Sequence, residues 1–407
     1  MSRVRELLKN TFNKIKTGFI KLKETEGFHA FIGSMVAITI GLLFGIILMI
    51  LINPNNALQG IGRLLKGMFN HPRGGWIGFG QMLYRATPMI FTGLAVAFAF
   101  KTGLFNIGAS GQFTVGLFAA VLIGILGDGL GSFQWIVAVI AGMGAGFLWG
   151  AIPGIFKAKY NVHEVITSIM FNYIGMYIVN GLLNSSFLSS KVVNGSTNRT
   201  WAVDQQARTS YWIFEDMFPN SGLDISILIA IATAIIIYFV LNKTVFGREL
   251  KSVGLNRDAA KYAGVNEKKS IFLSMSISGM IAGLGGALFI LAPSVRNLGT
   301  AYAIENEILG IGFDGIPVAL LAVSNPIGVI FSTFFISYIK LAGGPMQSVG
   351  FVSEIVEIII AVILYFSAFA LIITQNLGKI KNIIQRYKKK KDTKIDQTQL
   401  DSKVGDN

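Results

Sequence analysis

Residues 28–52 read FHAFIGSMVAITIGLLFGIILMILI, a run of 25 residues that contains no Lys, Arg, Asp or Glu. An α-helix needs roughly 20 predominantly apolar residues to cross the hydrocarbon core of a bilayer. The run is too long for the apolar region of a cleavable signal peptide, and no small-residue cleavage site follows it. It therefore predicts a membrane-spanning helix behind a basic N-terminal segment.

The composition extends this expectation to the whole chain. Of the 407 residues, 52% are apolar and 14% are charged, whereas soluble domains average about 25% charged residues. This balance excludes a soluble enzyme and a disordered chain. The absence of cysteine excludes disulfides and thiolate ligands, and three histidines leave little for a histidine-rich metal site or proton relay.

Nine further apolar stretches follow the first one. They lie near residues 86–100, 104–126, 133–156, 164–183, 223–241, 270–292, 305–323, 326–341 and 354–374. We therefore expect an all-α polytopic membrane protein with about ten transmembrane helices, in a domain that covers residues 28–375.

Basic residues are concentrated in three segments outside these stretches. Residues 1–27, 242–269 and 378–407 supply +13 of the net charge of +14. Because Lys and Arg favour cytoplasmic loops, these segments and both chain termini are predicted to be cytoplasmic. The positive charge thus indicates the cytoplasmic side of the membrane and not a surface that binds nucleic acid.

Three other segments outside the predicted spans complete the organisation. Residues 184–222 are predicted to form an external loop, and the basic tail 376–407 is predicted to be disordered. Residues 53–85 should lie outside, yet they carry four basic and no acidic residues. We interpret them as an amphipathic surface segment that ends in a glycine-rich turn at residues 74–80.

Polar residues interrupt the apolar sequence at residues 101–112, KTGLFNIGASGQ. Unpaired backbone groups in lipid cost several kcal/mol each, so a broken helix survives only where it faces protein or water. The segment therefore indicates either a transport pathway or a connecting loop between the second and third spans.

A second interruption, LGIGFDGIP at residues 309–317, places Asp314 within the eighth apolar stretch. An intramembrane carboxylate is costly and is a candidate functional group. The alternative is a buried carboxylate that caps a broken half-helix or pairs with Lys340. Because the two interruptions resemble each other, they also predict an inverted repeat.

The fifth span begins with a polar stripe. At helical spacing Glu164, Ser168, Asn172 and Gly175 share one face. This face could line a path, or it could hold helices together through hydrogen bonds. Small residues at positions 142, 146, 150 and 154, and at 278, 282 and 286, predict close helix packing.

The cytoplasmic loop contains a predicted short helix over residues 258–265. Asn256 is its expected N-cap and Gly264 its expected end. The helix could be the element on which a partner acts; the alternative is a solvated linker. No phosphate-binding loop G-x-x-x-x-G-K-[ST] occurs, so the chain is not expected to bind nucleotide itself.

These segments, in this order, resemble the permease family of bacterial ATP-binding cassette (ABC) importers for ribose, galactose and nucleosides, and most closely its nucleoside-type branch. The matching motifs cover residues 105–112, 164–173, 246–264 and 312–316. One departure is Ser110, where the family often has Glu.

The resemblance implies a type II-like importer permease with broken helices in the bacterial plasma membrane. It implies no enzymatic activity and no cofactor on this chain, because ATP and magnesium belong to a separate cytoplasmic ATPase. Further implied partners are a second homologous permease or a second copy of this chain, and an extracytoplasmic substrate-binding lipoprotein. No nucleic acid is expected.

Two sets of site residues follow from the polar breaks and the resemblance together. The predicted substrate-pathway residues are Phe105, Asn106, Gln112, Asn172 and Asp314. The predicted ATPase-coupling residues are Gly254, Asn256, Ala259, Ala260 and Gly264. Nucleosides are the expected substrate; the alternatives are ribose or galactose and, in a different class, an ion-coupled secondary transporter.

Overall fold

The computed structural model describes residues 26–70, 74–293 and 300–369, which are almost entirely helical. The chain divides into two compact units. One unit comprises residues 1–42 and 362–407, and the other comprises residues 43–361. The predicted basic segment 1–27 and the tail 376–407 fall almost wholly outside the described residues.

The described part of the first unit consists of two helical segments. They are the first part of α2 (Glu26–Ile52) and residues 362–369 of a helix that begins at residue 354. A Cβ atom on Gly41 would stand 2.2 Å from the side chain of Ile363. Glycine therefore lets the two segments approach closely.

The second unit contains the remaining helices. Its long helices are α4 (Gly75–Phe100), α5 (Ala109–Leu126), α6 (Gln134–Tyr160), α7 (Glu164–Leu183), α10 (Ser226–Lys243), α13 (Glu267–Leu291) and α15 (Pro326–Gln347). Its shorter helices are α3 (Ala57–Lys66), η1 (Gly67–Asn70), η2 (Asp128–Phe133), α8 (Ser189–Val192), η3 (Gln205–Ala207), α9 (Phe214–Met217), α11 (Val245–Leu255), α12 (Arg257–Tyr262) and α14 (Ile311–Leu321).

The predicted all-α polytopic fold is confirmed. Eight helices in the described residues are long and apolar enough to cross a membrane. Each of the ten predicted stretches contains helical backbone, although residues 305–310 precede α14 and residues 370–374 lie outside the described residues. One stretch is shorter than a full span, since α14 has 11 residues. The last helix is described from residue 354 to residue 369.

The interpretation of residues 74–80 as a glycine-rich turn is wrong beyond Gly74, because α4 begins at Gly75 and continues through Pro88. Gly74 precedes the helix at a φ of +108°, whereas Gly75 and Gly80 lie close to neighbouring side chains. A Cβ atom on Gly80 would stand 2.7 Å from the Cβ atoms of both Phe218 and Ser221. The sequence pattern alone could not distinguish a turn glycine from a contact glycine.

Glycine faces join α6 to α13, as their spacing predicts. A Cβ atom on Gly146 would stand 2.3 Å from the Gly279 carbonyl oxygen, and one on Gly142 would stand 2.6 Å from the Cβ atom of Ala287. In lipid, where no hydrophobic force draws helices together, such close backbone approach supplies the packing.

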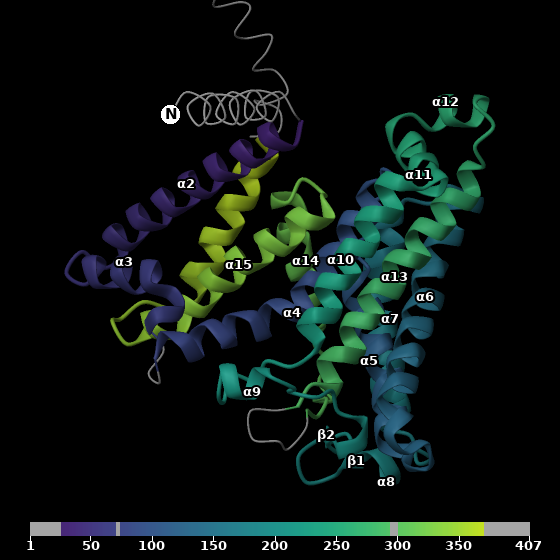
Figure 1. Cartoon of the computed structure of the whole chain (residues 1–407), viewed down its shortest axis with the longest axis horizontal. Helices are drawn as coiled ribbons and strands as arrows, with labels where there is room; N and C mark the ends of the chain where they lie inside the picture. The colour runs from purple at the N-terminus through teal and green to yellow at the C-terminus, as the bar shows by residue number, and fades with distance from the viewer. Residues whose placement is uncertain (1–25, 71–73, 294–299, 370–407) are drawn as a thin grey trace, which may run out of the picture. The chain divides into compact units, whose positions relative to one another are not determined.

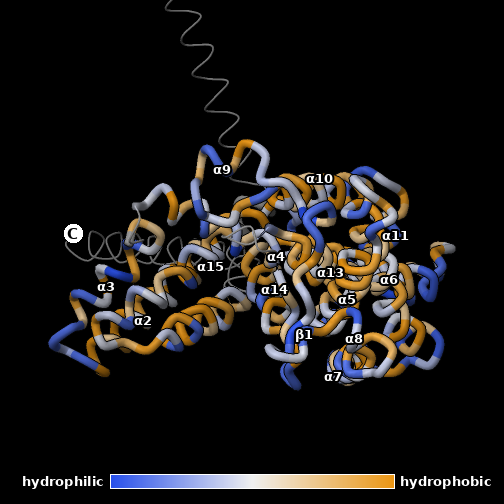
Figure 2. Tube along the Cα trace, turned by 90° about the horizontal axis from the view of Figure 1, so that it is seen from below, coloured by the Kyte–Doolittle hydropathy of each residue, from blue (hydrophilic) through white to orange (hydrophobic). Residues whose placement is uncertain are grey.

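The second unit has distinct ends (Figure 1). α13 lies beside α5 and α6, with α11 and α12 at one end of these helices and α8, β1 (Val193–Asn194) and β2 (Arg199–Thr200) at the other. The two strands pair antiparallel, and the amide of Thr200 donates to the carbonyl of Tyr302. Figure 2 shows apolar residues along the helices and hydrophilic residues in their connections.

Candidate substrate cavity and coupling loop

A buried cluster of polar side chains holds the connection between α4 and α5. The side-chain nitrogen of Asn106 donates to Gln112 Oε1 at 2.8 Å and to Ser278 Oγ at 2.6 Å. The Ser278 hydroxyl then donates to the Ala95 carbonyl at 2.6 Å. Asn106 is fully buried, so each of these polar groups needs the partner that it has.

Asn172 on α7 completes this cluster. Its Oδ1 atom accepts from the amide of Gly111 at 2.7 Å, and its Nδ2 atom donates to the carbonyl of Ile107 at 3.0 Å. Phe105 stacks on Phe100 with ring centroids 5.0 Å apart. The predicted shared face of α7 is confirmed, since Asn172 is buried with the other members of the stripe.

The structure thus brings Asn106, Gln112 and Asn172 together, with Phe105 next to them in the chain. Their polar atoms bond to one another, to Ser278 and to backbone groups of residues 107 and 111. This arrangement matches the alternative of interhelical hydrogen bonding. Their role in the pathway stays a prediction.

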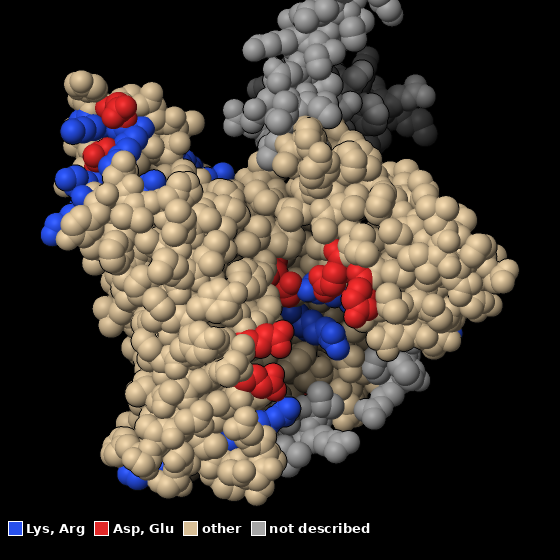
Figure 3. Space-filling view, turned by 180° about the vertical axis from the view of Figure 1, so that it is seen from behind, with Lys and Arg blue, Asp and Glu red and all other residues tan. Residues whose placement is uncertain are grey.

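Asp314 lines a different feature, a cavity of about 340 Å³. Its volume falls within the roughly 300–1,000 Å³ of typical small-molecule sites. Figure 3 shows a hollow in which acidic and basic side chains gather. The charged residues that line the cavity are Arg85, Asp224, Asp314, Lys340 and Glu357.

Lys340 bridges two carboxylates at this cavity. Its Nζ atom lies 2.7 Å from Asp314 Oδ1 and 3.1 Å from Glu357 Oε1. The predicted alternative, a carboxylate paired with Lys340, is therefore present. Asp314 lines the cavity while it is paired with Lys340. The ion pair is therefore compatible with a role of Asp314 in the pathway.

Aromatic and hydroxyl groups line the rest of the wall. Phe289, which is partly exposed, contributes aromatic surface, and Tyr84 contributes a phenol, whereas Phe91 lines the cavity with its side chain fully buried. The buried Asp224 carboxylate accepts hydrogen bonds from the hydroxyls of Thr209 and Ser226. The cavity can therefore offer both ring surface and charged hydrogen-bonding groups to a ligand.

The coupling loop, residues 242–269, contains the predicted short helix as α12, which ends at Tyr262, and a longer helix, α11, that the sequence did not predict. The side chain of Asn256 accepts from the amide of Ala259 at 2.9 Å and caps α12. Gly264 ends the element with φ at +85°, a conformation that glycine adopts without steric cost. The loop is thus a structured pair of helices and not a solvated linker.

Two of the predicted coupling residues, Ala260 and Gly254, pack against the rest of the second unit. Ala260 is buried, and it packs in a cluster with Leu104, Ala158 and Ile271. A Cβ atom on Gly254 would stand 2.5 Å from the carbonyl oxygen of Lys101. Because Ala260 is buried in this cluster, it holds α12 against the neighbouring helices. The exposed surface of the loop is formed by other side chains.

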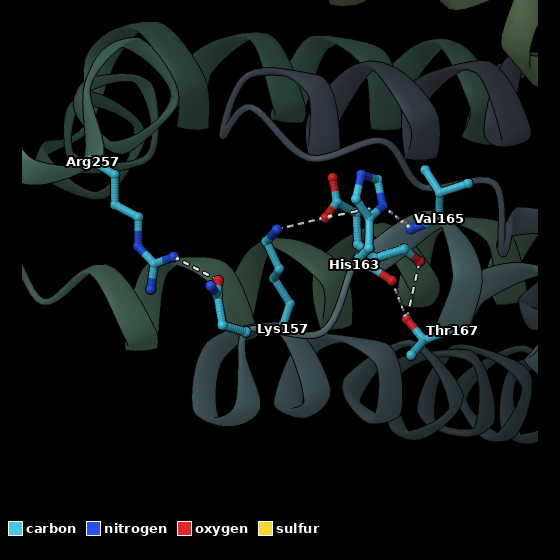
Figure 4. A network of polar contacts seen from close by, with 7 residues as sticks. Lys157, His163, Val165, Thr167 and Arg257 are labelled. Carbon is cyan, nitrogen blue, oxygen red and sulfur yellow. Dashed lines mark hydrogen bonds and ion pairs between the residues drawn. The ribbon is translucent and has the colours of Figure 1, made fainter.

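Arg257 connects α12 to two further elements. Its guanidinium lies 2.6 Å from Glu267 Oε2 at the start of α13, and it donates to Asn161 Oδ1 at 3.3 Å, just past the end of α6 (Figure 4). In the same region Lys157 pairs with Glu164 at 2.8 Å. Arg257 thus joins α12 to α13 and to the residue after α6, and the Lys157–Glu164 pair joins α6 to α7.

Comparisons with known proteins identify the architecture. The family described as "Branched-chain amino acid transport system / permease component" matches residues 78–368. The chain belongs to this permease family. It is therefore a multi-pass membrane protein built as a transport-system permease. No solved structure matches the permease significantly.

Curated relatives align with most of the permease. The guanosine ABC transporter permease protein NupP of Bacillus subtilis is 38% identical over 85% of this chain and 95% of that protein. The nucleoside ABC transporter permease protein NupB of Lactococcus lactis is 34% identical over 86% of this chain and 93% of that protein. The glucose ABC transporter permease protein TsgB13 of Haloferax volcanii is 30% identical over 71% of this chain and 75% of that protein.

The sequence did not predict several residues that the folded permease places at the cavity wall or on the surface of the coupling loop. Tyr84, Arg85 and Asp224 line the cavity, although each lies near the end of an apolar stretch where charge and phenol groups are common. On the coupling loop, Leu255 and Tyr262 are 89% and 95% exposed. The sequence does show these two large side chains among the charged residues of the loop, and such a pattern can indicate a contact surface for a partner.

Proposed function

We propose that this permease is the membrane subunit of an ABC importer that takes up nucleosides. The observation that carries the proposal is similarity to two nucleoside permeases, at 38% and 34% identity over at least 85% of the chain. The glucose permease is less similar and aligns with less of the chain, which places the sugar alternative second.

The cavity beside Asp314 supports a route for such a substrate. A nucleoside combines a flat base with a hydroxyl-rich sugar. Aromatic side chains can stack on the base, and the charged groups around Lys340 can accept or donate hydrogen bonds to the ribose hydroxyls. Phe289 lines the same cavity as Asp314 and Lys340.

A second permease chain is the expected membrane partner. Bacillus subtilis has NupP and NupQ, both named guanosine permeases, and Lactococcus lactis has NupB and NupC, both named nucleoside permeases. This chain is 38% and 34% identical to the first of each pair but 25% and 26% identical to the second. We therefore assign it to the NupP-like position of a heterodimer.

The remaining partners follow from the proposed importer. A cytoplasmic ATPase would dock on α11 and α12, where Leu255 and Tyr262 project from a basic surface. An extracytoplasmic lipoprotein would deliver the nucleoside to the opposite side. Both chain termini would lie in the cytoplasm, because the basic segments favour that side.

The experiment is uptake of radiolabelled guanosine and uridine by cells with and without this chain. We expect deletion to abolish uptake and a plasmid copy to restore it, with excess ribose and galactose without effect. Vanadate should block the restored uptake, and an ionophore should not. Loss of labelled ribose uptake in its place would establish the sugar alternative, and inhibition by the ionophore alone would establish a secondary transporter.

A further inference from the structure

The carboxylate of Asp224 belongs to the wall of the substrate cavity, just before α10 begins at Ser226. Only 1% of the surface of Asp224 is exposed. A carboxylate that is removed from water to this extent requires hydrogen-bond donors or a cation. The donors that Asp224 has inside the chain therefore show which part of the carboxylate is left for a ligand.

The described residues direct all their hydrogen bonds to one oxygen of this carboxylate. Asp224 Oδ2 accepts from the hydroxyls of Thr209 and Ser226, each at 2.5 Å, and from the amide of Ser226 at 3.3 Å. The amide of Thr209 donates to the carbonyl of Leu291 at 2.9 Å, so that Thr209 is itself held in place. Three donors on one oxygen fix the orientation of the carboxylate.

The other oxygen, Asp224 Oδ1, has no hydrogen-bond partner in the part of the chain that the structure describes. It is also not one of the buried side-chain oxygens that the fold encloses completely without a partner. Oδ1 therefore reaches accessible space, and the substrate cavity is the space that Asp224 lines. A ligand in the cavity can donate a hydrogen bond to this atom.

The phenol of Tyr84 lies near Asp224. Tyr84 is on α4, it lines the same cavity, and it is close enough to Asp224 for the two groups to interact electrostatically. Its hydroxyl has no hydrogen-bond partner among the described residues, and it too is not enclosed completely. An ionised carboxylate only accepts hydrogen bonds, whereas a phenol both donates and accepts them. This part of the wall thus offers an acceptor and a hydroxyl to a ligand.

We propose that Asp224 Oδ1 accepts a hydrogen bond from the 2′-hydroxyl of a ribonucleoside, while the Tyr84 hydroxyl bonds to the adjacent 3′-hydroxyl. The assignment rests on the proposed function, uptake of nucleosides. A carboxylate binds only donors, and ribose carries its two secondary hydroxyls side by side. Acidic side chains bind the ribose 2′-hydroxyl in the same way in dinucleotide-binding folds. Asp224 is then a residue that selects ribonucleosides over 2′-deoxynucleosides.

The base of the nucleoside fits another part of the cavity. Phe289 on α13 is partly exposed and lines the cavity, and an aromatic ring suits the flat face of a base. The donors on a base also differ from one base to the next, whereas every ribonucleoside carries the same pair of hydroxyls. We therefore assign the carboxylate to the sugar.

A substrate without the 2′-hydroxyl would leave Asp224 Oδ1 buried and unpaired. A site built to bind a hydroxyl rejects an analogue that lacks it, because the protein group loses water and gains no partner. We expect guanosine to be taken up at least about tenfold faster than 2′-deoxyguanosine. A 2′-fluoro analogue should be rejected at least as strongly, since fluorine cannot donate and is repelled by the carboxylate.

Asp224→Asn changes the atom that faces the cavity and keeps the internal bonds. The amide oxygen has to face the donors of Thr209 and Ser226, since the amide nitrogen in that place would oppose donor to donor. The nitrogen then replaces Oδ1, so a neutral donor takes the place of a charged acceptor. In D224N we expect the guanosine to 2′-deoxyguanosine uptake ratio to fall several-fold, and the 2′-fluoro analogue to be taken up faster than the 2′-deoxy one.

Two control variants separate recognition from structural support. Thr209→Val removes one donor from Asp224 Oδ2 but leaves Oδ1 as it is, so it should lower the Tm and keep the wild-type uptake ratio. D216N removes an exposed carboxylate on α9 and should change neither quantity. All variants are compared in the same cells, so that any external binding protein is common to them and a changed ratio belongs to the permease.

The measurements distinguish this inference from the proposed function. If wild-type cells do not need this chain to take up guanosine, the proposed function is wrong. If they need it but take up 2′-deoxyguanosine or its 2′-fluoro analogue as fast as guanosine, the role of Asp224 is wrong and the proposed function stands; this arm requires no variant to fold. A D224N chain that is present in the membrane and keeps the wild-type ratios, or that changes only the preference between guanosine and uridine, would also overturn the role.

Discussion

The backbone of Gly254, in the last turn of α11, lies directly against the turn that follows α4, so that a Cβ atom on Gly254 would stand 2.5 Å from the carbonyl oxygen of Lys101. The same Cβ atom would stand 2.9 Å from the amide nitrogen of Gly103. Three residues further along the chain is Asn106, which bonds to α5 and α13. A displacement of the coupling loop therefore reaches the buried polar cluster through backbone contact.

Substitution of Gly254 tests this contact. Gly254→Val must displace either the loop or the turn, and such overpacking costs roughly 1–3 kcal/mol. We expect nucleoside uptake to fall by about tenfold or more while the protein remains in the membrane at near wild-type abundance. Gly144→Val is the matched control, because nothing lies within 4 Å of a Cβ atom at that position. Equal uptake by the two variants would contradict the role of this contact.

The pairing of Arg257 with Glu267 predicts an effect on coupling without an effect on stability. Arg257 is 34% exposed, and ion pairs at such positions contribute only about 0.2–1 kcal/mol. Arg257→Glu should therefore leave the Tm nearly unchanged but reduce uptake, since like charges would then push α12 away from α13. The double variant R257E/E267R should regain uptake. Failure of the double variant to exceed R257E would exclude the pair as a link.

The hydrogen bonds of Asn106 predict a cost in stability. Asn106→Ala leaves the buried Gln112 Oε1 atom without its donor, and an unsatisfied buried group costs roughly 1–3 kcal/mol. We expect a lower Tm of the purified permease together with lower uptake. A double-mutant cycle with Ser278→Ala should be non-additive, because the two side chains share a bond. Additive losses would show that they act independently.

The cluster of Lys340, Asp314 and Glu357 predicts that the substitution of Lys340 and that of Asp314 differ in their effect on the Tm. Lys340→Gln leaves both Asp314 and Glu357 without their cation, whereas Asp314→Asn leaves the pair of Lys340 with Glu357. Lys340→Gln should therefore lower the Tm more than Asp314→Asn does. Both should impair uptake if the cavity carries substrate, and Lys340→Arg should preserve the charge. Wild-type uptake by Asp314→Asn and Asp314→Ala would remove this residue from the pathway.

The polar stripe on α7 shows which features of a site a sequence pattern can predict and which it cannot. The spacing of Glu164, Ser168 and Asn172 predicts a shared helix face, and all three residues are buried. The pattern does not say what that face meets. Whether Asn172 lines a path or bonds to the connection at residues 107–111 depends on the position of α5, which is set by packing between segments distant in sequence.

The same limit applies to Asp314. The sequence shows that a carboxylate lies in an apolar stretch, where it is energetically costly, and it offers Lys340 as a candidate partner. The cavity is not visible, because its wall comes from α4, α10, α13, α14 and α15 together. Arg85 and Asp224 join it only when those helices are packed.

The sequence by itself determined the class of the protein, the approximate place of its apolar helices, and the caps of the short loop helix at Asn256 and Gly264. These features follow from local properties: apolar length, backbone conformation and the hydrogen bonds of helix ends. Tertiary structure alone decided that Ala260 faces inward, that glycines at 75–80 belong to a helix, and that Tyr84, Asp224 and Lys340 line one cavity. Those outcomes depend on which surfaces meet, and in a membrane the meeting of helices is governed by shape and polar contact more than by hydrophobicity.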